Sequence, residues 1–206
     1  EENEKERKDR KRSGKLSASM LNWPLQHCIL KLKGIEPDPL DEYVLRKFKR
    51  GRDIEDWIVN LMDDVIERQK YTEYRNTVGY IDAVVDSKTY EHKNGIIPHE
   101  IKSVTNAKFK RIVNENKMDI GHGLQAAFYA VAGGYKSFAI DYVASDDLRI
   151  ICLIDDVANW RELVDNRITE VEKQLETGKV PVFEAREKWQ NDAKYNSYKS
   201  WMNLNI

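Results

Sequence analysis

The stretch Gly79-Tyr-Ile-Asp82-Ala-Val-Val85 decides how this chain is interpreted, together with Ile96-Ile-Pro-His-Glu100-Ile-Lys102-Ser-Val104 after a polar segment. Both apolar runs are typical of strands, expected over Thr77–Asp86 and Ile96–Val104, and Asn94-Gly95 is a turn signal between them. Two carboxylates and an ammonium therefore lie on apolar strands. Buried charges are costly unless a partner offsets their desolvation. A divalent cation bound to phosphate is such a partner.

The strand geometry groups these side chains. Residues two apart on a strand project from one face, so Glu100 and Lys102 project together while Ile101 points away. A neighbouring strand can bring Asp82 beside Glu100. The carboxylates, with the Ile101 carbonyl as a further ligand, would suit Mg²⁺ or Mn²⁺. Such a metal can bind a scissile phosphate oxygen and lower the pKa of a water, while Lys102 holds the water or the phosphate. The open alternative is a plain Glu100–Lys102 ion pair on a solvated face.

The other elements are predicted from hydrophobic spacing and from Gly and Pro signals. Helices are expected from Ser17 to Gly34 with Pro24 in the first turn, from Leu40 to Lys70 with a break near Gly51 left open, over Ile120–Ala132, and from Asp156 onward. Two more strands are expected over Lys136–Ala144 and Leu148–Asp155. The order α, α, β, β, α, β, β, α implies an α/β fold with a mixed central sheet packed by helices.

The composition favours a charge-rich soluble globular domain. Of the 206 residues 41% are hydrophobic and 33% charged, with a net charge of -1. Residues 1–15 contain no apolar side chain, so we expect a charged flexible arm, then a single domain over 16–206 with a helical tail from about 180. No apolar run approaches the roughly 20 residues that span a bilayer. We expect a cytoplasmic protein with no membrane partner, and Cys28 and Cys152 as reduced core hydrophobes.

Two further motifs flank the strands. Arg50-Gly-Arg52-Asp-Ile-Glu55 precedes them, and Gly121-His122-Gly-Leu-Gln125 follows on a helix. In this order, with Asp82 and Glu100-x-Lys102 between them, the motifs resemble the PD-(D/E)XK nuclease superfamily, particularly its RecB-like and lambda-exonuclease-like branches. The resemblance implies a restriction-endonuclease-like fold. It also implies catalytic Asp82, Glu100, Lys102, Gln125 and Glu55, with Asp82, Glu100, Glu55 and the Ile101 carbonyl around the metal.

DNA contacts are expected beside this site. Between strand and helix lies a basic stretch, Ser103 to Arg111, in which Lys108, Lys110 and Arg111 would track phosphates while Phe109 stacks on or wedges a base. A solvated charge run is the alternative. Arg52, His122 and Tyr129 are further candidates. His122 could equally be structural, and Tyr129 could pack with its hydroxyl satisfied.

The resemblance implies a Mg²⁺- or Mn²⁺-dependent DNA nuclease that leaves 5′-phosphates. An exonuclease of phage or bacterial recombination or repair is favoured, acting in a bacterial or phage-infected cell with recombination or replication proteins as partners. The alternatives are a structure-selective or nonspecific endonuclease, a catalytically decayed DNA-binding accessory protein, and a structural α/β protein. Iron–sulfur relatives carry three Cys near the C-terminus, but residues 189–201 contain none. No iron–sulfur cluster is therefore expected.

Overall fold

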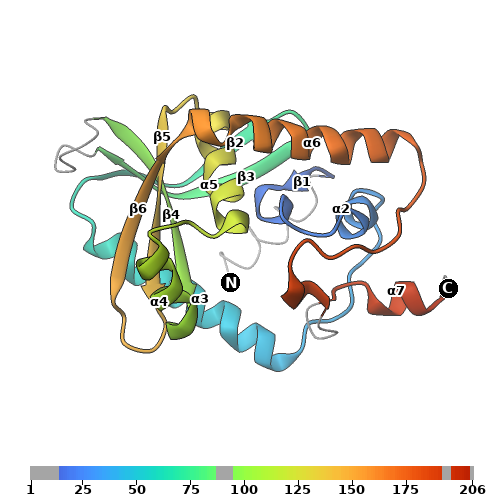
Figure 1. The fold of residues 1–206 in the computed structure, drawn as a ribbon, viewed down its shortest axis with the longest axis horizontal. Coiled ribbons are helices and arrows are strands. Elements are labelled where there is room, and N and C mark those ends of the chain that lie inside the picture. The colour runs from blue at the N-terminus through green and yellow to red at the C-terminus, as the bar shows by residue number, and fades with distance from the viewer. Residues whose placement is uncertain (1–13, 87–94, 192–195, 205–206) are drawn as a thin grey trace.

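The two decisive strands are present with the expected bounds, as β3 (Thr77–Asp86) and β4 (Ile96–Val104). They belong to a computed structural model that describes residues 14–86, 95–191 and 196–204 (Figure 1). The strands pair antiparallel, from Ala83 opposite His99 to Asp86 opposite Ile96. Asn94 of the expected turn lies outside the described residues.

Six strands form one mixed sheet in the order β1-β3-β4-β5-β6, with β2 beside β3. β5 (Ser137–Ala144) runs parallel to β4, and β6 (Ile150–Asp156) runs antiparallel to β5. The two-residue β1 (Leu16–Ser17) lies parallel to the start of β3, whereas β2 (Val65–Tyr74) pairs antiparallel along it. The predicted mixed central sheet is confirmed.

Helices cover the two faces of this sheet (Figure 1). On one face α5 (Ile120–Gly133) packs with α6 (Arg161–Glu176) and α2 (Leu25–Leu32), and on the other lies α3 (Glu42–Leu61). The remaining helical elements are α4 (Asn106–Glu115), α7 (Lys199–Leu204) and the short turns η1 (Ala18–Met20), η2 (Val157–Asn159) and η3 (Lys188–Asn191). The predicted α/β class with flanking helices is confirmed.

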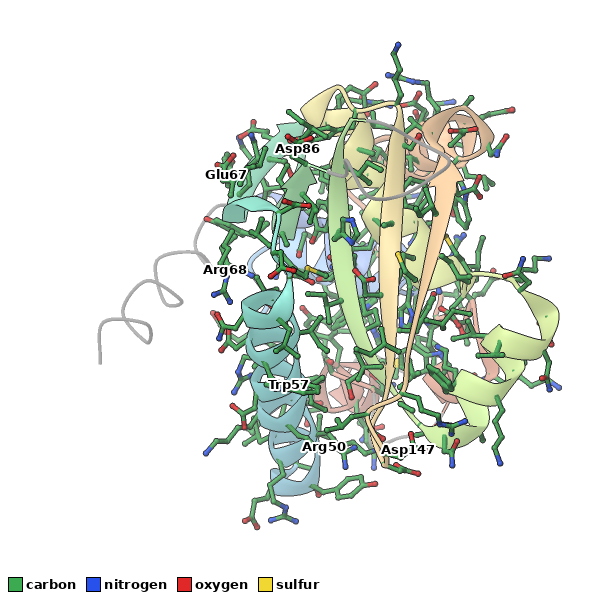
Figure 2. The ribbon with its side chains drawn as sticks, turned by 90° about the vertical axis from the view of Figure 1, so that its left-hand side faces the viewer. Arg50, Trp57, Glu67, Arg68, Asp86 and Asp147 are labelled. Atoms are coloured by element: carbon green, nitrogen blue, oxygen red, sulfur yellow. The ribbon has the colours of Figure 1, made fainter. Side chains whose placement is uncertain are left out.

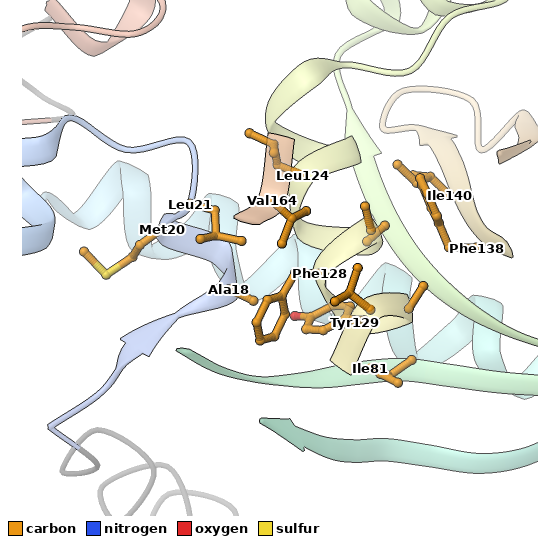
Figure 3. Packing of buried hydrophobic residues seen from close by; sticks show 14 of the residues in the cluster. Ala18, Met20, Leu21, Ile81, Leu124, Phe128, Tyr129, Phe138, Ile140 and Val164 are labelled. Atoms are coloured by element: carbon orange, nitrogen blue, oxygen red, sulfur yellow. The ribbon is translucent and has the colours of Figure 1, made fainter. Parts of the chain in front are cut away.

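The larger core surrounds α5. Leu124, Phe128 and Tyr129 of this helix pack among buried residues of η1, α6 and the sheet (Figure 3). A smaller core lies under α3, where Ile54 and Ile58 contact the sheet at Ile101 and Val143. Successive β4 side chains therefore alternate between the two cores. This alternation turns Glu100 toward α5.

Two expected helices have different bounds. The first begins at Leu25 rather than near Ser17, because Pro24 occupies the N-cap and η1 precedes it. Proline is well suited to a helix start because it lacks an N–H. The helix expected to reach Lys70 ends at Leu61, and it is continuous through Gly51. Residues 65–74 form β2 instead.

The basic stretch and the chain ends also differ from expectation. Most of residues 103–111, expected as a connection, belongs to α4, whose N-cap Thr105 accepts a hydrogen bond from the Lys108 N–H at 3.4 Å. The tail from about 180 contains only η3 and α7 as helical elements among its described residues. Residues 1–13 of the expected arm lie outside the described part of the chain. No helix in the described part is long and apolar enough to cross a bilayer.

Candidate active site

β3 and β4 separate beside Asp82. Their ladder ends at Ala83 and His99, and beyond it the Asp82 carboxylate accepts a hydrogen bond from the Ile101 N–H at 2.8 Å. The N–H and C=O of a strand residue point to the same edge. The Ile101 carbonyl, a predicted metal ligand, therefore also faces this fork between the strands.

Glu100 is the most enclosed carboxylate of the site, at 2% exposed. Its Oε1 accepts a hydrogen bond from Gln125 Nε2 at 2.7 Å and forms an ion pair with the Lys102 ammonium. Its Oε2 is buried and has no hydrogen-bond partner within the described residues. A buried oxygen in that state is costly unless a ligand binds to it.

Helix α3 brings Glu55 to the same place. The Glu55 and Asp82 carboxyl groups share a hydrogen bond, and Gln69 of β2 donates to Glu55 Oε1 at 2.9 Å. Three carboxyl groups from α3, β3 and β4 thus meet beside the ammonium of Lys102. Five predicted catalytic residues are brought together.

The pKa values reflect this crowding. Burial and the nearby Asp82 charge raise the pKa of Glu55 to about 7 and that of Glu100 to about 8. Burial also raises the pKa of Asp82, although Lys102 opposes the change. Burial alone would lower the pKa of Lys102, but Glu100 and Asp82 outweigh it and raise that pKa. Burial and mutual repulsion therefore favour the neutral, protonated forms of these carboxyl groups, even beside Lys102.

This donor set fits a hard divalent cation. Mg²⁺ and Mn²⁺ prefer carboxylate and carbonyl oxygens, which Asp82, Glu100, Glu55 and Ile101 offer beside the fork between β3 and β4. The Glu100 Oε2 atom without a partner supports the fit. A bound cation would also favour the ionised carboxylates and so lower the carboxyl pKa values that burial raises.

Helix α5 supplies the polar wall of the site. Its N-cap Asp119 accepts hydrogen bonds from the Gly121 and His122 N–H groups at 3.2 and 3.4 Å. Three residues after His122, Gln125 donates both to Glu100 and to the Tyr129 hydroxyl, the latter at 2.9 Å. Burial, then the charges of Lys102 and Lys108, lower the pKa of His122 to about 3. His122 is thus neutral at neutral pH.

The predicted basic residues divide into two sets. Lys108 Nζ lies 2.7 Å from Asp119 Oδ2, and an Arg111 guanidinium nitrogen lies 3.6 Å from the same oxygen, so both approach the α5 end of the site. Lys110 is exposed. It lies two residues after Lys108 on α4, which is about 200° further round the helix. Arg52 is half-buried, one helical turn before Glu55 on α3.

Two of the predicted DNA contacts, Phe109 and Tyr129, are wrong. Phe109 is 4% exposed and packs in the larger core, so its ring cannot stack on or wedge a base. Tyr129 is likewise buried in that core, with its hydroxyl bonded to Gln125. The alternative prediction for Tyr129, that it packs with its hydroxyl satisfied, is the correct one.

Another group of ligand-type side chains lies on the α3 side of the sheet. Atoms of His99, Asp141 and Cys152 that could bind a metal all lie within 4.8 Å of one another. His99 Nδ1 and Asp141 Oδ2 are already 2.6 Å apart in a buried hydrogen bond. Cys28 is buried as expected, whereas Cys152 is half-buried.

The sequence hypotheses missed Gln69 and Asp119. The helix predicted to reach Lys70 includes Gln69, because residues 65–70 lack a clear strand pattern. Gln69 is held in place by β2. The neighbouring Arg68 lies beyond the end of α3 (Figure 2) and donates a hydrogen bond to Asn60 of that helix at 2.8 Å. The sequence does contain a signal for Asp119, because Asp directly before an apolar helical run is a common N-cap residue.

The site opens into a groove of about 690 Å³. Lys102, Lys108, His122 and Gln125 line one part of it. Residues of η1, α2, α3, the segment between α2 and α3, and the C-terminal segment line most of the rest.

Known structures share this fold. The alkaline exonuclease LHK-Exo from Laribacter hongkongensis matches with a TM-score of 0.56 and 14% identity, over 81% of this chain and 92% of that chain. Its complex with dAMP gives the same values. The crystal structure of SSO0001 matches with a TM-score of 0.46 and 12% identity, over 90% of this chain and 84% of that chain. No family model and no curated protein sequence matches the chain. At such identities the likeness to LHK-Exo shows a common fold.

Proposed function

We propose that this chain is a divalent-metal-dependent DNA nuclease. The observation that carries the proposal is the meeting of Glu55, Asp82 and Glu100 beside Lys102, with a buried Glu100 oxygen that lacks a described partner. The fold shared with an exonuclease supports it, and the dAMP complex of that enzyme favours DNA as the substrate class.

Each residue has a role in this proposal. Asp82, Glu100, Glu55 and the Ile101 carbonyl would hold Mg²⁺ or Mn²⁺, which when bound offsets phosphate charge and acidifies water. Lys102 orients the attacking water or the phosphate, and Gln125 fixes the Glu100 carboxylate. The water oxygen bonds to phosphorus as the bond to the 3′ oxygen breaks. The products are a 5′-phosphate and a 3′-hydroxyl.

The test is hydrolysis of linear DNA with Mg²⁺ or Mn²⁺ by the full chain. Lys102→Ala and Asp82→Asn are each expected to lower the rate by at least about 100-fold, because each removes a charge that acts on the reacting phosphate. Circular dichroism melts should show that both variants remain folded. Unchanged cleavage by either variant would remove that residue from the mechanism.

We further propose exonuclease activity in phage or bacterial recombination or repair, in the cytoplasm, alongside recombination or replication proteins. The support is the exonuclease LHK-Exo among the structures that share the fold. Linear and closed circular DNA of one sequence should be compared at equal concentration. Circles degraded as fast as linear molecules would make the activity endonucleolytic.

A further inference from the structure

The groove outside the carboxylates has aromatic walls. Its lining includes Phe48 of α3 and Trp189 of η3, together with Lys102 and Lys108. Phe48 is 52% exposed and Trp189 46% exposed. A volume of about 690 Å³ lies within the range of roughly 300–1,000 Å³ for sites that enclose a small organic ligand. The space thus suits a few nucleotide units.

Phe48 is aligned with the metal-ligand candidate on the same helix. Phe48, Arg52 and Glu55 are spaced i, i+4 and i+7, which puts them on one face of α3. At 1.5 Å per residue, Phe48 lies about 10 Å along the helix axis from Glu55. An extended strand with one phosphate at the carboxylates would therefore carry a nearby base past Phe48.

Trp189, on the C-terminal segment that also lines the groove, is held in place by its neighbour. Gln190 donates to the Asn22 carbonyl at 2.8 Å and accepts from the Arg186 and Glu187 N–H groups at 2.7 and 3.1 Å. Glu187 in turn accepts a hydrogen bond from the Asn22 side chain. The turn that carries Trp189 is thus fixed to the N-terminal segment while the indole remains half exposed.

The lysines and the aromatic rings of the groove both suit a nucleic-acid ligand. Lysines attract phosphates, and aromatic faces stack on bases irrespective of sequence. Inside a duplex each base face is covered by its neighbours, so such platforms can act only on unpaired nucleotides. Lys102 and Lys108 already pair with Glu100 and Asp119, so the aromatic rings carry the choice of ligand, and a duplex would not explain those rings.

We propose that the groove receives a single-stranded DNA end, with Phe48 and Trp189 of its lining as base-stacking platforms. This inference rests on the proposed nuclease function and names its substrate class. The platforms would hold the unpaired end while the phosphate at Glu55, Asp82 and Glu100 is cleaved.

The test is binding of a fluorescein-labelled single-stranded oligonucleotide to the full chain in EDTA, followed by anisotropy. Phe48→Leu and Trp189→Leu keep apolar volume but lose the π face. Each is expected to bind about tenfold more weakly. Trp57→Leu and Tyr43→Leu are matched controls. Trp57 of α3 (Figure 2) is 41% exposed and lies about 180° round the helix from Phe48. Neither Trp57 nor Tyr43 lines the groove. Both controls should bind as wild type.

Wild-type affinity in both platform variants would overturn the inference, provided that their melting temperatures match the controls. Equal affinity of the unmodified chain for a blunt duplex would also overturn it. The nuclease proposal is judged separately, from hydrolysis by the unmodified chain with Mg²⁺ or Mn²⁺. Platform-dependent binding without hydrolysis would retain the groove inference and reject the nuclease.

Discussion

Gln69 combines an unusual backbone with a contact to the site. Its flanking residues Arg68 and Lys70 pair with Ala83 and Ile81, so it lies opposite Asp82 in the β2–β3 ladder. Its φ of 50° is in the left-handed region, which costs a non-glycine residue roughly 1–2 kcal/mol. From this position it donates to Glu55. Strain that supports a site group is a feature of functional positions.

Gln69→Gly separates the strain from the hydrogen bond. Glycine adopts positive φ freely, but it also loses about 0.5–1 kcal/mol more chain entropy on folding. The free energy of unfolding is therefore expected to stay within about 1 kcal/mol of wild type. The hydrolysis rate should fall about tenfold, because Glu55 loses the group that orients it. Urea unfolding and DNA hydrolysis measure the two effects. Full activity in this variant would make the Gln69–Glu55 contact incidental.

At the scale of elements, the strands that carry the site were predictable and their partners were not. β3 and β4 have long apolar runs, so their bounds follow from local sequence. β2 is mostly exposed on both faces and has no apolar alternation, so only its pairing with β3 makes it a strand. In α4 a short run of basic residues obscured the buried pair Phe109 and Ile112. The charged positions of the site were therefore found, but Gln69 on β2 was not.

The contact between β3 and α5 sets a second expectation. A Cβ at Gly79 would lie 2.4 Å from a Tyr129 ring carbon and 3.0 Å from Ala18 Cβ. Gly79→Ala should therefore displace Tyr129 and cost about 1–3 kcal/mol in the free energy of unfolding. Because the Tyr129 hydroxyl bonds to Gln125, hydrolysis should slow as well.

Gly51→Ala is the matched control for Gly79→Ala. A Cβ at Gly51 would have no heavy atom within 4 Å, and the residue lies inside α3. Alanine there should stabilise the chain by up to about 1 kcal/mol through helix propensity. Urea unfolding of the two variants is expected to give opposite signs. A destabilisation of equal size in both would contradict the close-packing argument.

Across the whole molecule, the C-terminal segment returns to the N-terminal part of the chain. The His27 ring of α2 packs against Phe183 and Tyr198, with ring centroids 5.4 and 5.2 Å apart. The Ser197 carbonyl accepts a hydrogen bond from the Asp38 N–H at 2.7 Å. These contacts join residues more than a hundred positions apart, and no local pattern predicts them. They also form part of the groove wall.

His27 makes this docking sensitive to acid. Burial lowers its pKa from 6.5 to about 4, against a smaller opposing effect of a hydrogen bond to Asn196. Below pH 6.5 the unfolded chain binds a proton that the folded chain resists, so stability is full above that pH and is lost as the pH falls toward 4. The loss is about 3 kcal/mol at 1.36 kcal/mol per pKa unit.

His27→Phe keeps a ring but cannot titrate. Urea unfolding at pH 7, 5.5 and 4 should show a smaller decline in this variant than in wild type, by about that amount. Since all other titrating groups are common to both proteins, parallel pH profiles would mean that His27 does not control the docking.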